Sequence, residues 1–106
     1  PELHVLYCEN DNEAFGAVQA LEERGYVCGP EGVEVITFDA TRQGLILCLE
    51  GRISLAVECN PLLGPLVEEV IRTLEAGRTP ERHYYVQEQL FTQQDLSQDF
   101  IDQRAY

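Results

Sequence analysis

Short apolar segments alternate with longer amphipathic segments along most of this chain. The apolar segments are six to nine residues long and rich in Val, Ile, Leu, Phe and Tyr, a composition typical of buried strands. The last of them alternates polar and apolar residues, which predicts that one of its faces is solvated. We therefore predict strands at residues 3–9, 33–38, 53–58 and 83–91.

The segments between these strands have helical periodicity and recognisable ends. The helix expected at residues 12–24 starts among three good N-cap residues at 10–12 and stops at Gly25. The helix expected at residues 42–50 follows Asp39 and Thr41, either of which can cap it. The third helix has the clearest apolar stripe and carries Pro65 in its first turn. A short helix capped by Thr92 is expected near the end. This order predicts an α/β fold, with a mainly parallel sheet and alternating helices.

Size and charge narrow the classes of function. The 106 residues allow one small domain, and the formal net charge is −12 with seven Arg and no Lys. This charge disfavours binding to nucleic acid or to an anionic membrane surface. No apolar run reaches the roughly 20 residues that span a bilayer, and no signal segment is recognisable. Because the chain begins at Pro1 without Met, we expect a mature product or an excised piece.

Catalytic and metal-binding motifs are not recognisable in the sequence. The four cysteines are far apart and lack zinc-site spacing, so we predict free thiols rather than disulfides, and no metal or cofactor. An enzyme is therefore not predicted. The alternative is a small thiol enzyme that uses Cys8, with His4 as base, or Cys59. A depressed thiol pKa would favour this alternative.

Amide and carboxylate residues follow the predicted strands at the edge where α/β sheets bind ligands. Asn10 and Asp11 follow the first strand, Asp39 follows the second, and residues 58–60 follow the third. Such groups suit a sugar, because each sugar hydroxyl both donates and accepts hydrogen bonds. The simpler interpretation is that these side chains only cap helices, and we expect this of Asp11. Taken together, the three strand ends favour a binding edge.

Several segments resemble the type 1 periplasmic sugar-binding proteins of ABC importers. "NDNEAFGAVQALEERG" is similar to that family's Asn-Asp pattern, helix and Gly stop, and "VITFDATRQGLILCLEGRISLAVECNP" to its following strand, loop, helix and strand. "ECNPLLGP", "EQLFTQQDL" and "DQRAY" resemble the branch that includes galactofuranose-binding proteins. The resemblance covers almost the whole chain.

This resemblance implies a two-lobed α/β protein that encloses a monosaccharide between its lobes and whose closure is sensed by a transporter permease. Asn10 and Asp39 fall where the family hydrogen-bonds sugar hydroxyls. The third ligand position falls on Cys59 instead of the usual Asn or Gln, so Asn60 is the substitute candidate. The implied location is the periplasm, or the cell exterior by a lipid anchor.

The resemblance extends only to the C-terminal third of the family's proteins, so the chain has the partial type 1 fold. It implies that residues 1–57 are part of the C-terminal lobe, that 58–61 cross the hinge, and that 62–106 add a helix and a strand to the N-terminal lobe. Uncovered edges and helix faces in such a piece predict self-association. The alternative within the same fold is the effector-binding domain of a LacI-type transcription regulator, which an upstream helix-turn-helix would favour.

Overall fold

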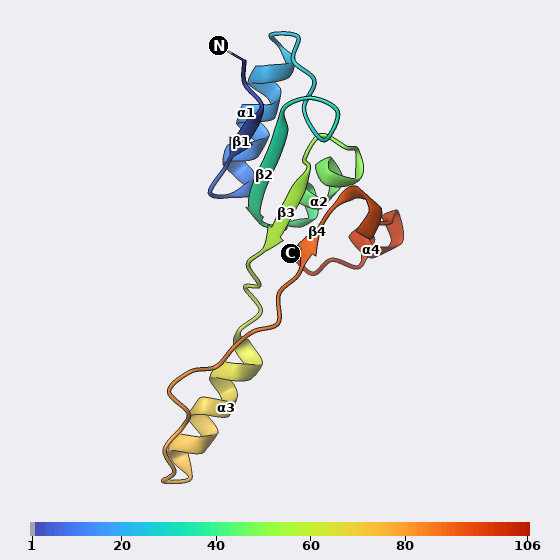
Figure 1. Ribbon diagram of the computed structural model, residues 1–106. Coiled ribbons are helices and arrows are strands. Elements are labelled where there is room, and N and C mark those ends of the chain that lie inside the picture. The colour runs from blue at the N-terminus through green and yellow to red at the C-terminus, as the bar shows by residue number, and fades with distance from the viewer. Residues whose placement is uncertain (1) are drawn as a thin grey trace.

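A four-stranded sheet with strand order β1-β2-β3-β4 forms the centre of the larger body of the molecule (Figure 1). The first three strands are parallel, as predicted, and β4 pairs with β3 in the antiparallel direction. The computed structural model describes residues 2–106. The elements are β1 (Val5–Tyr7), α1 (Asp11–Glu22), β2 (Glu34–Asp39), α2 (Arg42–Leu49), β3 (Leu55–Glu58), α3 (Gly64–Glu75), β4 (Leu90–Phe91), the 3-10 helix η1 (Gln93–Asp95) and α4 (Gln98–Asp102).

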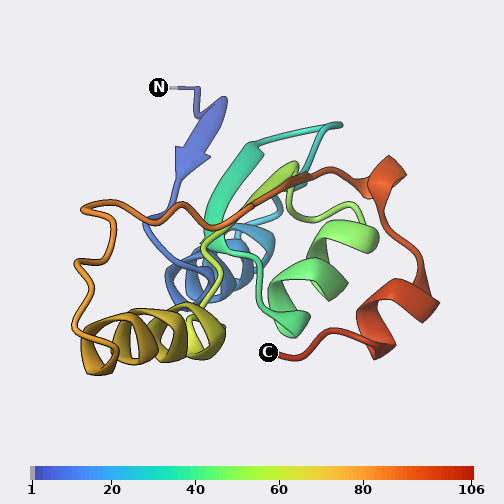
Figure 2. The same cartoon turned by 90° about the horizontal axis from the view of Figure 1, so that it is seen from below.

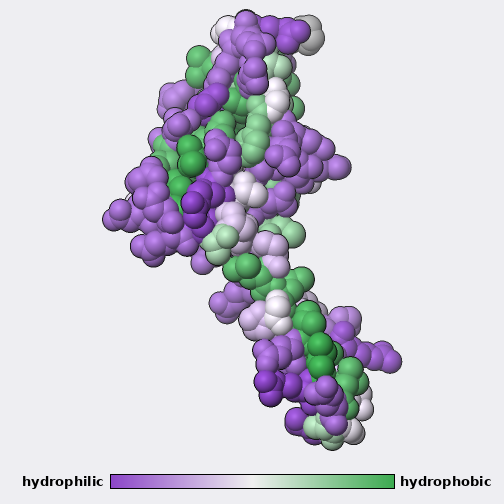
Figure 3. Space-filling view, turned by 180° about the vertical axis from the view of Figure 1, so that it is seen from behind, coloured by the Kyte–Doolittle hydropathy of each residue, from purple (hydrophilic) through white to green (hydrophobic). Residues whose placement is uncertain are grey.

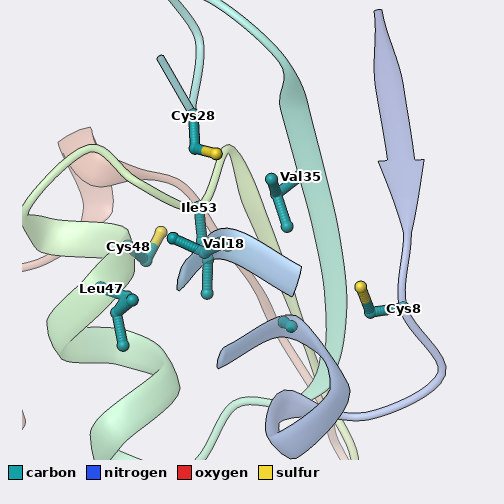
Figure 4. Close-up of a cluster of buried hydrophobic side chains, with 8 residues drawn as sticks. Cys8, Val18, Cys28, Val35, Leu47, Cys48 and Ile53 are labelled. Carbon is teal, nitrogen blue, oxygen red and sulfur yellow. The ribbon is translucent and has the colours of Figure 1, made fainter. Parts of the chain in front are cut away.

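The core lies between one face of the sheet and the helices α1 and α2, which both cover that face (Figure 2). Its main cluster consists of apolar residues from β2, both helices and the loops around them, including Val18, Val35 and Ile53 (Figure 4). Three cysteines, Cys8, Cys28 and Cys48, are buried in this cluster, and all four cysteines are free thiols. The prediction that the thiols act as small buried apolar residues is confirmed for these three and is wrong for Cys59, which is exposed.

The opposite face of the sheet carries apolar residues that no helix within residues 2–106 covers. Val5 and Tyr7 of β1 are 51% and 62% exposed, and the alternating residues of β2 and β3 on the same face are only half-buried. Tyr7 packs against Phe38 with ring centroids 5.4 Å apart. A parallel sheet is normally covered on both faces, so this face is an incomplete layer.

Helix α3 stands apart from the body on two chain segments and makes the molecule long. The principal extents are 61 × 32 × 19 Å and the radius of gyration is 17.6 Å, against about 13 Å for a compact domain of this length. The predicted apolar stripe is present, but no residue of α3 is buried. Figure 3 shows the resulting apolar surface along this arm, where Val67, Ile71 and Leu74 are about half exposed.

The predicted strand at residues 83–91 is much shorter in the structure. Only Leu90–Phe91 forms a strand, because β3 ends at Glu58 and the chain before Leu90 has no strand beside it. The predicted terminal helix is also divided. Thr92 caps η1 rather than a longer helix, the backbone becomes extended at Leu96, and Ser97 then caps α4.

Residues 90–106 return to the body, where β4 pairs with β3 and where α4 and η1 pack against α2. Within the described chain, residues 62–89 therefore stand apart from the body. The assignment of these segments to particular lobes of a larger protein stays a prediction.

Candidate functional site

The carboxyl ends of the three parallel strands lie at one edge of the sheet, facing the α3 arm (Figure 1). Tyr7 is in register with Ile36, and Asp39 is in register with Glu58. Asn10 follows β1 by three residues at this same edge. The structure therefore brings Asn10 and Asp39 to one rim, as the sequence predicts for residues after parallel strands.

Asn10 is the N-cap residue of α1. Its backbone is extended, and its side-chain oxygen accepts a hydrogen bond of 3.0 Å from the N–H of Glu13. The side chain is half-buried and its NH2 group makes no hydrogen bond within residues 2–106. Asn10 thus caps α1 through the oxygen of its amide, and its NH2 group is available as a donor.

Asp39 ends β2 in an unusual backbone conformation. Its φ is 98° and that of Ala40 is 53°, and these are the only two non-glycine residues with positive φ in the described part of the chain. No other residue in 2–106 donates to the half-buried carboxylate, and no buried side-chain oxygen in this part of the chain lacks a partner, so its oxygens face solvent. Strained backbone combined with an unpaired carboxylate is typical of ligand-binding positions.

Asn60 lies at the turn between body and arm and follows Cys59, whose N–H donates to the Asp39 carbonyl at 3.3 Å. Its side-chain oxygen accepts from the N–H of Leu62 at 2.8 Å, and its own N–H donates to the carboxylate of Glu88 at 2.9 Å. It lines a hollow of about 300 Å³ together with Glu58 and residues 103–106, and neither Asn10 nor Asp39 lines this hollow. The structure therefore gives Asn60 a clear role in shaping the turn between body and arm.

Asp11 is an internal anchor rather than the cap of its own helix, a role that belongs to Asn10. Its side chain is 2% exposed. One carboxylate oxygen accepts from the Thr37 hydroxyl at 2.9 Å, and the other accepts from the N–H and the hydroxyl of Thr41 at 2.7 and 2.6 Å. Since Thr41 caps α2, the carboxylate of Asp11 ties the first turn of α1 to β2 and to the start of α2.

A buried polar cluster beside this rim was not predicted from the sequence. Arg104 forms an ion pair of 2.8 Å with Glu58, and their side chains are 10% and 8% exposed. The hydroxyl of Tyr106 donates to the same Glu58 oxygen at 2.6 Å and accepts from Arg104 at 2.7 Å. Arg104 also lies over the Tyr106 ring, with 4.1 Å from its central carbon to the ring centroid. The two partners are 46 residues apart, and no local pattern indicates such a pair.

Hydrogen bonding controls the ionisation of this cluster. Burial alone would raise the pKa of Glu58, but hydrogen bonds from Tyr106 and Arg104, the charge of Arg104 and the Gln89 N–H together hold the pKa below its ordinary value. Burial and the hydrogen bond to Glu58 raise the pKa of Tyr106 above its ordinary value. Glu58 is thus a stable carboxylate and Tyr106 a stable hydroxyl donor.

The buried thiols Cys8 and Cys48 lack the depressed pKa of an activated nucleophile. Burial, followed by the nearby charge of Glu13, raises the pKa of Cys8, and burial raises the pKa of Cys48 to about 11. Cys59 is exposed at the turn after β3. Residues 2–106 contain no group of three or more metal-ligating side chains, and no helix among them is long and apolar enough to span a membrane.

Sequence comparison relates residues 1–57, more than half of the chain, to the family "Periplasmic binding proteins and sugar binding domain of LacI family". The fructose import binding protein FruE of Bifidobacterium longum (strain NCC 2705) is 27% identical over 86 residues, which are 81% of this chain and 25% of that protein.

Solved structures have the same fold. A Mycobacterium smegmatis protein in complex with β-D-fucofuranose is 29% identical, with a TM-score of 0.81 over 90% of this chain and 31% of that one. The periplasmic binding protein of the arabinose ABC transporter from Shewanella sp. ANA-3, bound to α- and β-L-arabinofuranose, is 24% identical, with a TM-score of 0.83 over 98% and 34% of the two chains. The chain thus spans a quarter to a third of the length of these proteins.

Proposed function

Because this chain belongs to the family of periplasmic binding proteins and LacI-type sugar-binding domains, we propose that it is part of the substrate-binding component of a carbohydrate ABC importer. It is not an enzyme in this proposal. Its ligand is a monosaccharide, and the furanose complexes of related proteins favour a furanose form. The observation that carries the proposal is the accessible, unpaired carboxylate of Asp39, in a strained turn at the same sheet edge as Asn10.

The chemistry of this rim suits a sugar with neighbouring hydroxyl groups. The carboxylate of Asp39 accepts from one or two hydroxyls in charge-assisted hydrogen bonds, and the NH2 group of Asn10 donates to a hydroxyl oxygen. Asn60 contributes the NH2 group of its amide from the turn that leads to the arm, since its oxygen is already bonded to Leu62. The remaining contacts come from residues outside this chain.

The shape of the molecule supports a division between two lobes. In the proposed division, residues 2–58 and 90–106 belong to one lobe and residues 62–89 to the other. The two connecting segments run side by side, since the N–H of Glu58 donates to the Gln89 carbonyl at 2.9 Å. The sugar binds between the lobes, and an ABC permease recognises the closed form outside the cytoplasm, where a lipid anchor or the periplasm retains the protein.

Sugar binding is tested on the complete protein, with whatever segments its natural gene encodes around residues 1–106. A thermal-shift screen of pentoses and hexoses should find one that raises the melting temperature, because a ligand that binds only the folded state stabilises it. Asp39→Asn should weaken binding of that sugar by about a hundredfold, the loss of a charge-assisted contact. The matched control is Glu34→Gln, at the opposite end of the same strand. If no sugar stabilises the wild-type protein, the proposal is wrong.

The effector domain of a LacI-type regulator remains the second candidate, because the family includes such domains. FruE is an import binding protein, and the arabinose-binding protein is a component of an ABC transporter, which favours the importer. The upstream reading frame distinguishes the two: a helix-turn-helix supports the regulator, and a signal peptide or lipoprotein cysteine supports the importer.

We expect residues 1–106 to self-associate when produced alone. The groove of about 300 Å³ between α3 and residues 84–86 is lined by apolar residues, and burying it in a second copy removes apolar surface from water. Ile71→Glu should shift the chain towards monomer in size-exclusion chromatography with light scattering. Thr73→Glu places the same charge on the same helix outside the groove and should leave the association unchanged. A monomeric wild-type chain would contradict this expectation.

A further inference from the structure

We propose that Arg104 is a positioning residue for the sugar site: its guanidinium holds the Asp39–Ala40 turn in the conformation that presents the Asp39 carboxylate to the ligand. This inference rests on the proposed function, because Asp39 is the ligand residue that it concerns. Arg104 itself does not contact the sugar in this proposal.

The contact that carries the inference is a double hydrogen bond to the turn. The Nε and one terminal nitrogen of Arg104 both donate to the carbonyl oxygen of Ala40, at 3.0 and 2.7 Å. Ala40 is fully buried with a φ of 53°, and the preceding Asp39 has a φ of 98°. Residues with a Cβ resist this left-handed region, at a cost of about 1–2 kcal/mol per residue. A cation that binds the turn's carbonyl offsets that cost.

Arg104 is itself fixed on its other sides, so it can impose a geometry on the turn. Glu58 holds the second terminal nitrogen, the Tyr106 hydroxyl accepts from the first, and the Phe91 and Tyr106 rings lie beside the guanidinium plane. A planar guanidinium held at each of its nitrogens has little freedom to move. The Ala40 carbonyl is therefore held against a rigid group and not against a mobile surface side chain.

The same segment offers a matched control. Arg42 anchors the backbone of residues 102–106, with a terminal nitrogen that donates to the carbonyl of Arg104 at 2.6 Å and to that of Asp102 at 3.4 Å. Its side chain makes no hydrogen bond to Asp39 or Ala40. Substituting Arg42 therefore weakens only the attachment of residues 102–106, whereas substituting Arg104 also removes the hydrogen bonds to the Asp39–Ala40 turn.

The experiment uses the complete protein and the sugar found by the thermal-shift screen. Arg104→Lys keeps the charge but loses the bidentate donation to Ala40, and we expect it to weaken sugar binding by roughly tenfold. Arg42→Gln should change binding by less than about twofold. In a double-mutant cycle, Arg104→Lys should have almost no further effect once Asp39→Asn is present, because both changes remove one interaction. If Arg104→Lys does not fold, Tyr106→Phe replaces it. This variant removes one support of Arg104 and should weaken sugar binding a few-fold.

A second readout needs no sugar. The three-bond H–N–Cα–H coupling constant of Ala40 reports its φ, and it should leave the left-handed value in Arg104→Lys but not in Arg42→Gln. The inference would be overturned if Arg104→Lys changed neither the coupling constant of Ala40 nor the affinity for the sugar. It would also be overturned if the losses of binding free energy from Arg104→Lys and Asp39→Asn were additive in the double-mutant cycle. If the wild-type protein binds no sugar, the proposed function fails and the positioning role fails with it, while the coupling constant still shows whether Arg104 holds the turn.

Discussion

Asp11→Ala is expected to lower the free energy of unfolding of the chain by about 3 kcal/mol, the largest effect of any single substitution that we propose. The change removes a carboxylate that accepts three hydrogen bonds and is 2% exposed. It leaves the buried hydroxyl of Thr37 without an acceptor, and such a group costs roughly 1–3 kcal/mol. It also removes the acceptor for the N–H of Thr41, the residue that caps α2.

Urea denaturation followed by circular dichroism measures this effect, and Asn12→Ala is the matched control. Asn12 is the next residue in the same turn of α1, but it is exposed, so its substitution should change stability by less than about 0.5 kcal/mol. Asp11→Asn should fall between the two, because an amide keeps one acceptor but turns a donor towards Thr41. If Asp11→Ala and Asn12→Ala have equal effects, the anchor contributes no measurable stability. A domain of this kind has only about 5–15 kcal/mol in total, so the predicted loss is large.

The elements around this anchor follow directly from local sequence. Asn10 and Thr41 are good cap residues before amphipathic segments, and the helices after them begin within a residue of the predicted starts. The short apolar segments become the parallel strands because they carry β-branched residues and are separated by helices long enough for crossovers. The expectation that Asp11 caps α1 was wrong, and the cap is Asn10. Both residue types favour that position, and only the tertiary contacts of Asp11 with Thr37 and Thr41 distinguish them.

The remaining differences arise where distant segments meet. The alternation at residues 83–91 is typical of a strand, but strands need a neighbour, and only Leu90–Phe91 finds one in β3. The apolar stripe of α3 predicts a buried face, yet within residues 2–106 only the chain near Tyr84 packs against it. The strain at Asp39 has no local signal either, because its positive φ depends on a carbonyl held by Arg104, far along the chain.

The ion pair between Glu58 and Arg104 joins the end of β3 to the last residues of the chain and fixes the place where the arm begins. Its side chains are about nine-tenths buried, and the remaining Glu58 oxygen accepts from the N–H of Gln89 at 3.0 Å. Breaking a fully buried pair by removing one partner costs roughly 3–5 kcal/mol. Because a hollow open to solvent adjoins this pair, we expect Glu58→Gln to lower stability by about 2 kcal/mol at neutral pH.

This loss should depend on pH in a direction fixed by the lowered pKa of Glu58 in the folded protein. A carboxyl that is more acidic when folded stabilises the fold above its unfolded pKa, near 4.5, and this stabilisation disappears as the pH falls through the folded pKa. The difference between wild type and Glu58→Gln, measured by urea denaturation, should therefore be constant from about pH 7 to pH 5 and shrink below 4.5.

The control for this measurement is Glu68→Gln, which breaks the exposed pair between Glu68 and Arg72 on α3. Both of its side chains are more than half exposed, so water screens the pair and its loss should cost less than about 0.5 kcal/mol at any of these pH values. If the stability difference between wild type and Glu58→Gln stayed the same down to pH 3, Glu58 would have the same pKa in the folded and unfolded protein. That result would contradict the hydrogen-bonded cluster described here. A difference that shrinks would identify the buried cluster as one source of acid sensitivity at the junction between body and arm.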